Sequence, residues 1–310
     1  MNTIVYSDKS FRKHQQPISM HIQKNNNGNS SGTVYFIGAG PGDPELVTVK
    51  GARTLAEAEV IITDRLASDA IIQQYANKDA IIVEAGKEGG NKNSYTQQNI
   101  NQLLLQFSNL YEKTVRLKGG DTGIFSNIFD ELKTLQENNI RYEIIPGITA
   151  AAGASAYTGV PLTARGYASG VQFLTYYKNT IVSDENWNRL AAFENTLVFY
   201  MSSNNLLSLV KNLLHAGAQS NIPFIVVEHA TTPQQRVHSF SLDSFLHNPV
   251  QNFASPSIVI MGHVAELYKN FSWFEGTTET ALKYFRSVED KTAYLKIHSF
   301  ITQKNIANAD

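Results

Sequence analysis

The sequence has no cysteine among its 310 residues. Disulfides, thiolate-bound zinc or iron–sulfur centres and a cysteine nucleophile are therefore excluded. Positive and negative charges nearly cancel, with 26 Lys and Arg residues against 27 Asp and Glu residues. A nucleic-acid-binding protein usually carries a strong positive field, so this balance argues against that class. An anionic ligand would need a local basic pocket.

Long apolar runs are also missing. No stretch approaches the roughly 18 residues that a membrane-spanning helix needs, and the first residues lack the apolar segment of a secretory signal. With the lack of cysteine, this predicts a soluble, cytoplasmic protein. Neither the H-E-x-x-H spacing of a metallohydrolase nor a G-x-S-x-G elbow is present, so no metal is predicted.

The pattern of short apolar runs predicts an α/β protein with two domains. A polar tail at 1–32 is expected to be disordered, and an N-terminal α/β domain at 33–146 follows it. In that domain, β-branched runs alternate with amphipathic segments, which is typical of a largely parallel sheet covered on both faces. The expected strands are 34–38, 60–63, 80–86, 115–119 and 142–147.

After residue 146, a small-residue helix at 149–159 opens a second α/β domain, 147–275, with a mixed sheet. One long helix is expected at 204–216. A helical extension of unknown role is expected at 276–310, from the apolar spacing there. The expected strands are 170–177, 196–201, 223–228, 235–242 and 256–262.

A glycine-rich loop, GAGPGDPEL, follows the first strand at 38–46. Such a loop lets a backbone approach a ligand closely, and it permits a dinucleotide fingerprint with Asp64 as the ribose-binding acid. Against that interpretation, Asp43 stands where the third glycine belongs, and Pro41 and Pro44 stiffen the loop. An ordinary turn between strand and helix is the other interpretation.

Extended to GAGPGDPELVT, the loop closely resembles the opening motif of the tetrapyrrole methylases that use S-adenosylmethionine. The similarity continues in order over about 33–275, and within the family it is greatest to the uroporphyrinogen-III C-methyltransferases. The further matching segments are TDRLAS (63–68), AGK (85–87), LKGGD (117–121), PGITAAAGASAYTGVPLT (146–163), FYM (199–201), ATTPQQR (230–236) and SPSIVIMG (255–262).

The resemblance implies two methyl transfers to uroporphyrinogen III, giving precorrin-2 for siroheme or cobalamin. It places Asp64 as proton acceptor and Lys87 as proton donor. Without the resemblance, Asp64 could be a helix N-cap and Lys87 a solvated loop lysine. Ligands of open α/β sheets bind at the carboxyl ends of the strands, where Asp64, Lys87 and Gly119 are expected to cluster.

The resemblance also implies a homodimer and a site without metal, and the charge balance and short apolar runs predict no nucleic-acid or membrane partner. The substrate carries eight carboxylates, so cations are expected around it. Those predicted to bind it are Arg65, Lys118, Arg165 and Lys178. The residues implied for S-adenosylmethionine are Pro41, Gly119, Gly120, Asp121, Ile124, Thr149, Ala150, Met201 and Ala230. Met201 could instead be core filling, the usual role of a methionine at a strand end.

The sequence departs from the family near the expected substrate site. The family's phenylalanine-glycine-arginine-glycine run is replaced within 121–128, which removes an arginine, and Ala164 and Asn93 stand where histidines are expected. Its threonine-glycine-histidine is Thr175-Tyr176-Tyr177 here. These changes leave two alternatives open: a related methylase with a different substrate, and a binding protein that holds cofactor or porphyrin without turnover. A nicotinamide-dependent oxidoreductase is a third alternative, less favoured by the sequence than these two.

Overall fold

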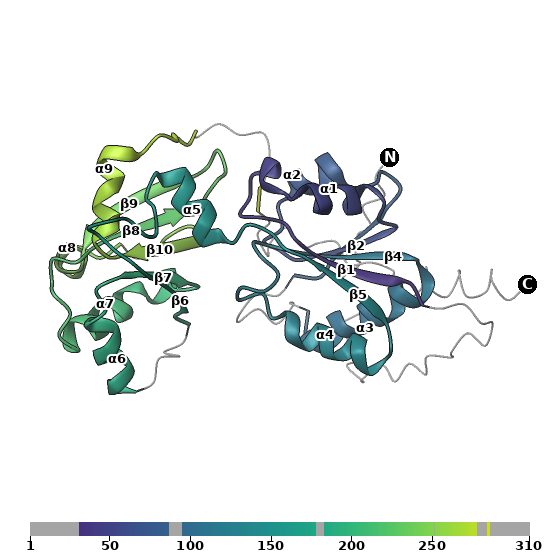
Figure 1. Ribbon diagram of the computed structural model, residues 1–310, viewed down its shortest axis with the longest axis horizontal. Helices are drawn as coiled ribbons and strands as arrows, with labels where there is room; N and C mark the ends of the chain where they lie inside the picture. Colours follow the sequence, from purple (N-terminus) through teal and green to yellow (C-terminus); the bar gives the residue numbers. More distant parts are fainter. Residues whose placement is uncertain (1–30, 87–94, 178–182, 251, 278–283, 286–310) are drawn as a thin grey trace, which may run out of the picture. The chain divides into compact units, whose positions relative to one another are not determined.

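The computed structural model describes residues 31–86, 95–177, 183–250, 252–277 and 284–285. They divide into two compact units, each with its own five-stranded sheet (Figure 1). The first unit holds the described residues up to Gly38, then Thr48–Pro146 and Phe285. The second holds Ala39–Val47 and Gly147–Tyr284, so the glycine-rich loop groups with the second unit although it follows a strand of the first.

The first sheet is entirely parallel, as predicted, and its strand order is β3-β2-β4-β1-β5. Its strands are β1 (Thr33–Gly38), β2 (Val60–Thr63), β3 (Ile81–Glu84), β4 (Lys113–Lys118) and β5 (Arg141–Ile145). The expectation of strands apolar and covered on both faces is wrong for β5. This strand lies at the sheet edge, where Tyr142 and Ile144 are exposed.

Helices cover both faces of this sheet, with α1 and α2 on one side and α3 and α4 on the other (Figure 1). The helices are α1 (Val49–Ala56), α2 (Asp69–Tyr75), α3 (Gln97–Leu110) and α4 (Ile128–Glu137). Under α3, the core packs Ile100 and Leu104 against Val34 and Ile62 of the strands. A capping box at Thr96 fixes the start of α3.

The second sheet is mixed, as predicted, in the order β6-β7-β10-β8-β9. The β6–β7 pair is parallel and every other pair is antiparallel. Its strands are β6 (Val171–Thr175), β7 (Thr196–Tyr200), β8 (Pro223–Glu228), β9 (Arg236–Ser241) and β10 (Ser257–Met261).

Successive residues of these strands feed two cores, one on each face of the sheet. Phe199 and Val226 face a core formed with α7, whereas Val198 and Ile225 face a core formed with α5. The helices of this unit are α5 (Ala150–Thr158), α6 (Asp184–Ala191), α7 (Leu206–His215), α8 (Leu242–His247) and α9 (Tyr268–Phe271), and the 3-10 turns are η2 (Pro44–Leu46), η3 (Ser203–Asn205) and η4 (His263–Leu267).

Two short helices, α6 and α8, were not predicted from the sequence, because each buries only two apolar residues and so leaves a weak helical pattern. The predicted tail and the 276–310 extension lie almost wholly outside the described residues. No helix in the described part of the chain is long and apolar enough to cross a membrane.

Candidate functional site

The glycine-rich loop is fixed within the second unit by Asp43. The Asp43 carboxylate caps η2 by accepting a hydrogen bond from Glu45 N at 2.9 Å. Its other oxygen accepts from the Tyr157 hydroxyl at 2.5 Å, and Asp43 N donates to Thr231 Oγ1 at 3.1 Å. Burial and then the Asp43 carboxylate raise the pKa of the Tyr157 phenol.

This geometry contradicts the dinucleotide interpretation of the loop. In a dinucleotide fingerprint, the glycine-rich turn runs directly into the N-terminus of a long helix that receives the pyrophosphate. Here the loop passes through the single turn η2, and α1 begins only at Val49, capped by Thr48. The structure therefore gives no support to the nicotinamide alternative.

Pro41, predicted to contact cofactor, packs directly on α5. A Cβ placed on Gly153 would lie 2.5 Å from Pro41 Cγ and 3.0 Å from the Thr231 side chain. Only glycine permits this approach. The small-residue run of α5 thus lets the loop lie against the helix.

The start of α5 is organised by Tyr200, at the end of β7. Its hydroxyl lies 2.7 Å from Thr149 Oγ1 and accepts a hydrogen bond from Ala151 N at 3.1 Å. Thr149 is the N-cap residue, but its own side chain makes no capping hydrogen bond. Tyr200 therefore places the predicted cofactor residues Thr149 and Ala150 next to its own neighbour, Met201.

Three non-glycine residues near these elements have left-handed backbones: Met201 (φ +56°), His229 (+48°) and Thr231 (+67°). This conformation costs about 1–3 kcal/mol for each residue and is often retained at functional sites. The Met201 side chain is 52% exposed, so it does not fill the core. Ala230 lies buried between two of these residues. The second unit thus brings together Pro41, Thr149, Ala150, Met201 and Ala230.

In the first unit, Asp64 directly follows β2 and is held by backbone amides. Its Oδ1 accepts hydrogen bonds from Leu66 N and Ala67 N, both at 3.0 Å. Gly119 N, after β4, lies 3.3 Å from Oδ1 and 3.2 Å from Oδ2. Asp64 is not a helix N-cap, because α2 begins at Asp69 with Ser68 as its cap. The structure joins Asp64 to Gly119, as the sequence predicted.

The loop after β4 contains four predicted cofactor residues. A Cβ on Gly119 would lie 2.6 Å from the Leu66 side chain, so glycine is required beside the Asp64 turn. Gly120 has φ +69°, and Asp121 accepts a hydrogen bond from Gly123 N at 2.7 Å. Ile124 is exposed. This close approach fixes the loop against the Asp64 turn.

Lys118 is not the accessible, carboxylate-binding cation that the sequence predicted. Its side chain is 2% exposed, and its ammonium lies 3.0 Å from Glu131 Oε1 on α4. Arg116, on the same face of β4, lies 3.4 Å from the same carboxylate. Burial, followed by the charge of Arg116, lowers the pKa of Lys118. A substrate carboxylate cannot reach a side chain enclosed in this way.

The other predicted cations are less constrained by the structure. Arg65 is half-buried beside Asp64, and Arg165 is exposed in the loop between α5 and β6. Lys87, the predicted proton donor, and Lys178 lie outside the described residues, as does Asn93.

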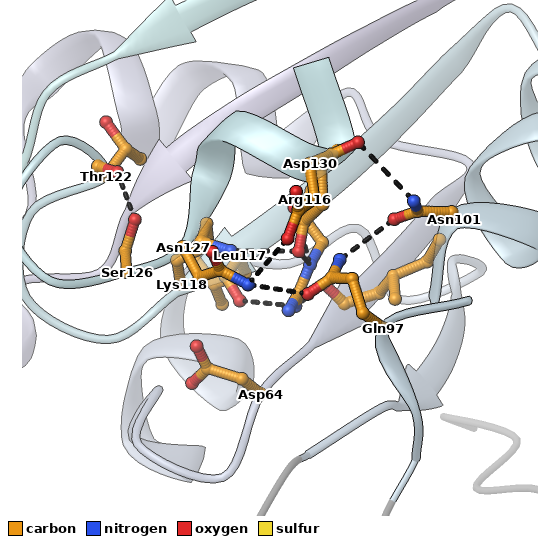
Figure 2. A network of polar contacts seen from close by, with 12 residues as sticks. Asp64, Gln97, Asn101, Arg116, Leu117, Lys118, Thr122, Ser126, Asn127 and Asp130 are labelled. Atoms are coloured by element: carbon orange, nitrogen blue, oxygen red, sulfur yellow. Dashed lines mark hydrogen bonds and ion pairs between the residues drawn. The ribbon is translucent and has the colours of Figure 1, made fainter. Parts of the chain in front are cut away.

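Two departures from the family pattern have visible structural roles. Tyr176 is fully buried, with its hydroxyl 3.0 Å from Ser208 Oγ and its ring packed on Trp187. It fills the core where the family has a glycine. Asn127, within the segment 121–128 from which an arginine of the family is lost, has a left-handed backbone and donates to Gln97 and Asp130 (Figure 2).

Sequence reasoning missed Tyr157, Tyr200 and Glu131, which hold the predicted residues in place. Tyr157 and Tyr200 lie inside segments 146–163 and 199–201, which match the family motifs, so the resemblance could have pointed to both residues. No feature of the sequence pointed to Glu131, because its role depends on how α4 packs against β4. The described residues contain no group of three or more His, Asp or Glu that could hold a metal ion.

The profile of the Tetrapyrrole (Corrin/Porphyrin) Methylases matches residues 33–245. The chain belongs to this family. A siroheme synthase of Vesicomyosocius okutanii is 38% identical over 246 residues, which is 79% of this chain and 52% of that protein. The chain therefore spans about half the length of the curated relatives that it matches.

Solved structures of the same family match the whole fold. The native uroporphyrin III C-methyl transferase of Thermus thermophilus is 32% identical, with a TM-score of 0.66, over 76% of this chain and 100% of that one. The Thermus thermophilus enzyme complexed with S-adenyl homocysteine is 31% identical, with a TM-score of 0.65 over the same shares of the two chains. The tetrapyrrole methylase fold predicted from the motifs is thus confirmed.

Proposed function

We propose that the chain transfers methyl groups from S-adenosylmethionine to two carbons of uroporphyrinogen III and so forms precorrin-2 for siroheme or cobalamin. The observation that carries this proposal is the arrangement of Asp64 and Gly119 at the carboxyl ends of neighbouring strands, in a chain of the tetrapyrrole methylase family. The names of the siroheme synthase and Thermus thermophilus relatives support this substrate.

The residues of the second unit suit the methyl donor. Pro41, Ala150 and Ala230 are small or apolar, Thr149 carries a hydroxyl, and Met201 is exposed on a left-handed backbone. From the first unit we propose Gly119, Gly120, Asp121 and Ile124 for the same ligand. When bound, S-adenosylmethionine supplies an electrophilic methyl group attached to a sulfonium.

Asp64 is proposed to accept the proton that the methylated macrocycle releases. Backbone amides hold Oδ1 at 3.0 Å, while Oδ2 receives one hydrogen bond, from Gly119 N, in the described part of the chain. This leaves Oδ2 able to accept a proton without the carboxylate turning. Lys87 is proposed as the donor, and Arg65, Arg165 and Lys178 as partners of the substrate carboxylates. The homodimer and the cytoplasmic location stay predictions.

The direct test is anaerobic incubation of the protein with uroporphyrinogen III and methyl-labelled S-adenosylmethionine, followed by mass analysis of the oxidised tetrapyrrole. A gain of two labelled methyl groups is expected. No gain, with cofactor binding demonstrated separately, would contradict uroporphyrinogen III as the substrate.

A second candidate is a tetrapyrrole methylase with a changed substrate. It is favoured by the altered segment 121–128, which lacks the arginine of the family and in which Asn127 bonds to Gln97 and Asp130 of its own unit. Methyl transfer to a corrin precursor, with none to uroporphyrinogen III, would select this candidate.

A further inference from the structure

The helix α5 has few side chains that could fix its position. Its sequence is AAAGASAYT, in which Tyr157 is the only large residue. Ala151 and Ala154 pack in the core against the second sheet, and an alanine makes few van der Waals contacts. The proposed cofactor residues Thr149 and Ala150 lie at the start of this helix. Their position therefore depends on contacts that other elements make with α5.

The end of α5 is contacted by residues 271–277, the segment that ends α9 and follows it. The Trp273 indole N–H donates to Ala156 O, in the last turn of α5, at 2.7 Å. Gly159, which ends the helix with φ +71°, lies so close to Phe271 that a Cβ on it would collide with Phe271 O. Only glycine permits both this backbone and this approach. The segment thus anchors the end of α5.

The same segment packs against the Tyr157 side chain. The Tyr157 ring centroid lies 5.3 Å from that of Trp273 and 5.0 Å from that of Phe274, and the latter two rings are 5.7 Å apart. Tilted and edge-on aromatic pairs at such distances are favourable. The Tyr157 hydroxyl donates to Asp43, so these two rings fix the side chain that holds the glycine-rich loop.

The segment also lies against the stretch that carries Ala230. Gly276 is so close to Gln235 that a Cβ on it would collide with Gln235 O. The Gln235 side chain accepts a hydrogen bond from Thr231 N at 2.8 Å and donates one to Tyr157 O at 3.2 Å. The segment therefore touches α5 and the stretch before β9, both of which carry proposed cofactor residues.

Burial in the core does not account for Trp273. It is 61% exposed, whereas Trp187, the other tryptophan of the chain, is 9% exposed in the core on the α7 face of the second sheet. We propose that Trp273 is a positioning residue for S-adenosylmethionine: its contacts with Ala156 and Tyr157 keep α5 and the glycine-rich loop in the arrangement that binds the methyl donor. The inference rests on the proposed function, and Trp273 acts through α5 without touching the cofactor.

Trp273→Ala removes both the hydrogen bond and the ring. A site whose parts are correctly placed only about a tenth of the time binds about tenfold more weakly, so we expect the Kd for S-adenosylmethionine, measured by calorimetry, to rise about tenfold. Trp273→Phe keeps a ring beside Tyr157 without the donor and should raise the Kd about threefold. The kcat at saturating S-adenosylmethionine should stay within about twofold of the wild type, because bound ligand restores the arrangement.

The matched control is Trp187→Phe, in the core on the other face of the sheet, where the Trp187 ring packs on Tyr176. It should lower the melting temperature, because the smaller ring leaves a cavity, without changing the affinity for S-adenosylmethionine. A merely structural Trp273 would behave in the same way. If Trp273→Ala fails to fold, Trp273→Phe carries the test. A Trp273 variant that folds and binds S-adenosylmethionine as tightly as the control would overturn the proposal.

A readout independent of turnover separates this inference from the proposed function. Linkage is reciprocal, so if the Trp273 hydrogen bond favours binding, a bound ligand must favour that bond. The exchange of the Trp273 indole proton with solvent, followed by NMR and assigned with Trp187→Phe, should therefore slow when S-adenosylhomocysteine is bound. An unchanged rate would overturn the role of Trp273 even in an active enzyme. A slower rate in a protein that transfers no methyl group to uroporphyrinogen III would retain that role and reject the proposed substrate.

Discussion

The residues proposed to bind and to react are chemically different in the two units. In the second unit they are proline, threonine, alanine and methionine, held by the hydroxyls of Tyr157, Tyr200 and Thr231. In the first unit Asp64 lies next to a buried cluster of three charged groups. The contrast teaches that the Pro41 loop contacts of the second unit and the Asp64 contacts of the first are set by separate networks, so substitutions in the two places should affect binding and rate differently.

The largest expected effect is on rate, from Asp64→Asn in the first unit. The amide keeps the shape but cannot accept a proton as the carboxylate does, so kcat should fall about 10²- to 10⁴-fold. Binding of S-adenosylmethionine, measured by calorimetry, should stay within about twofold, since the amide keeps an oxygen that can accept from Gly119 N and the second unit is unchanged. Asp79→Asn, at an exposed turn, serves as the control and should be fully active. Equal losses of rate and affinity would contradict the separation.

The converse experiment is Gly153→Ala in the second unit. Alanine favours a helix by about 1 kcal/mol over glycine, but its Cβ would meet Pro41 at 2.5 Å and push the loop off α5. We expect the affinity for S-adenosylmethionine to fall about tenfold or more, or by at least ~1.4 kcal/mol, while the helix remains folded. Gly170→Ala places its Cβ in ordinary contact, 3.5 Å from Asn195, and should leave calorimetric affinity unchanged. Similar affinities in both variants would show that the Pro41 contact is unimportant.

A smaller effect is expected from Tyr157→Phe, which removes the hydroxyl that binds Asp43. The hydrogen bond is charge-assisted but only partly buried, so the free energy of unfolding should fall by about 1 kcal/mol. Urea unfolding monitored by circular dichroism measures this change, and Tyr167→Phe at an exposed site is the control. The cofactor affinity should weaken severalfold, whereas a lower kcat at saturating cofactor would contradict the comparison.

The smallest effect concerns alkaline pH. Because the pKa of Tyr157 is raised in the folded state, its stabilising contribution is complete below the unfolded-state pKa of about 10 and is lost as pH rises above it. Between pH 10 and 11, the free energy of unfolding should fall more in the wild type than in Tyr157→Phe, by less than about 1 kcal/mol. Urea titrations at pH 8, 9, 10 and 11 would show this, and parallel curves would contradict it.

Much of the fold could be predicted because the strands are short β-branched runs bounded by turns. VIIT at 60–63 and the run at 223–228 match β2 and β8, since buried strands leave a strong local pattern. The edge strand β5 did not follow the prediction that every strand of the first sheet is covered on both faces. Its apolar residues resemble those of a covered strand, and only its place at the sheet edge accounts for the exposure of Tyr142 and Ile144.

The candidate site was predicted less completely, for a physical reason. Asp64 and Gly119 each follow a parallel strand, so their meeting at one sheet edge follows from topology. The burial of Lys118 depends on Glu131, which is thirteen residues away on a helix whose packing the sequence does not reveal. The membership of the glycine-rich loop in the second unit likewise depends on long-range contacts with Tyr157 and Thr231.

That loop has a consequence for the order in which the chain is made. Ala39–Val47 leaves the ribosome about a hundred residues before Gly147, yet it completes the unit that begins there. Nascent chain that carries β1 through β5 must keep this loop unpaired until α5 has been synthesised. Cleavage at residue 146 would yield two fragments, and the second would lack Pro41 and Asp43. Each unit therefore has to be studied within the intact polypeptide or as a permuted chain that restores the loop.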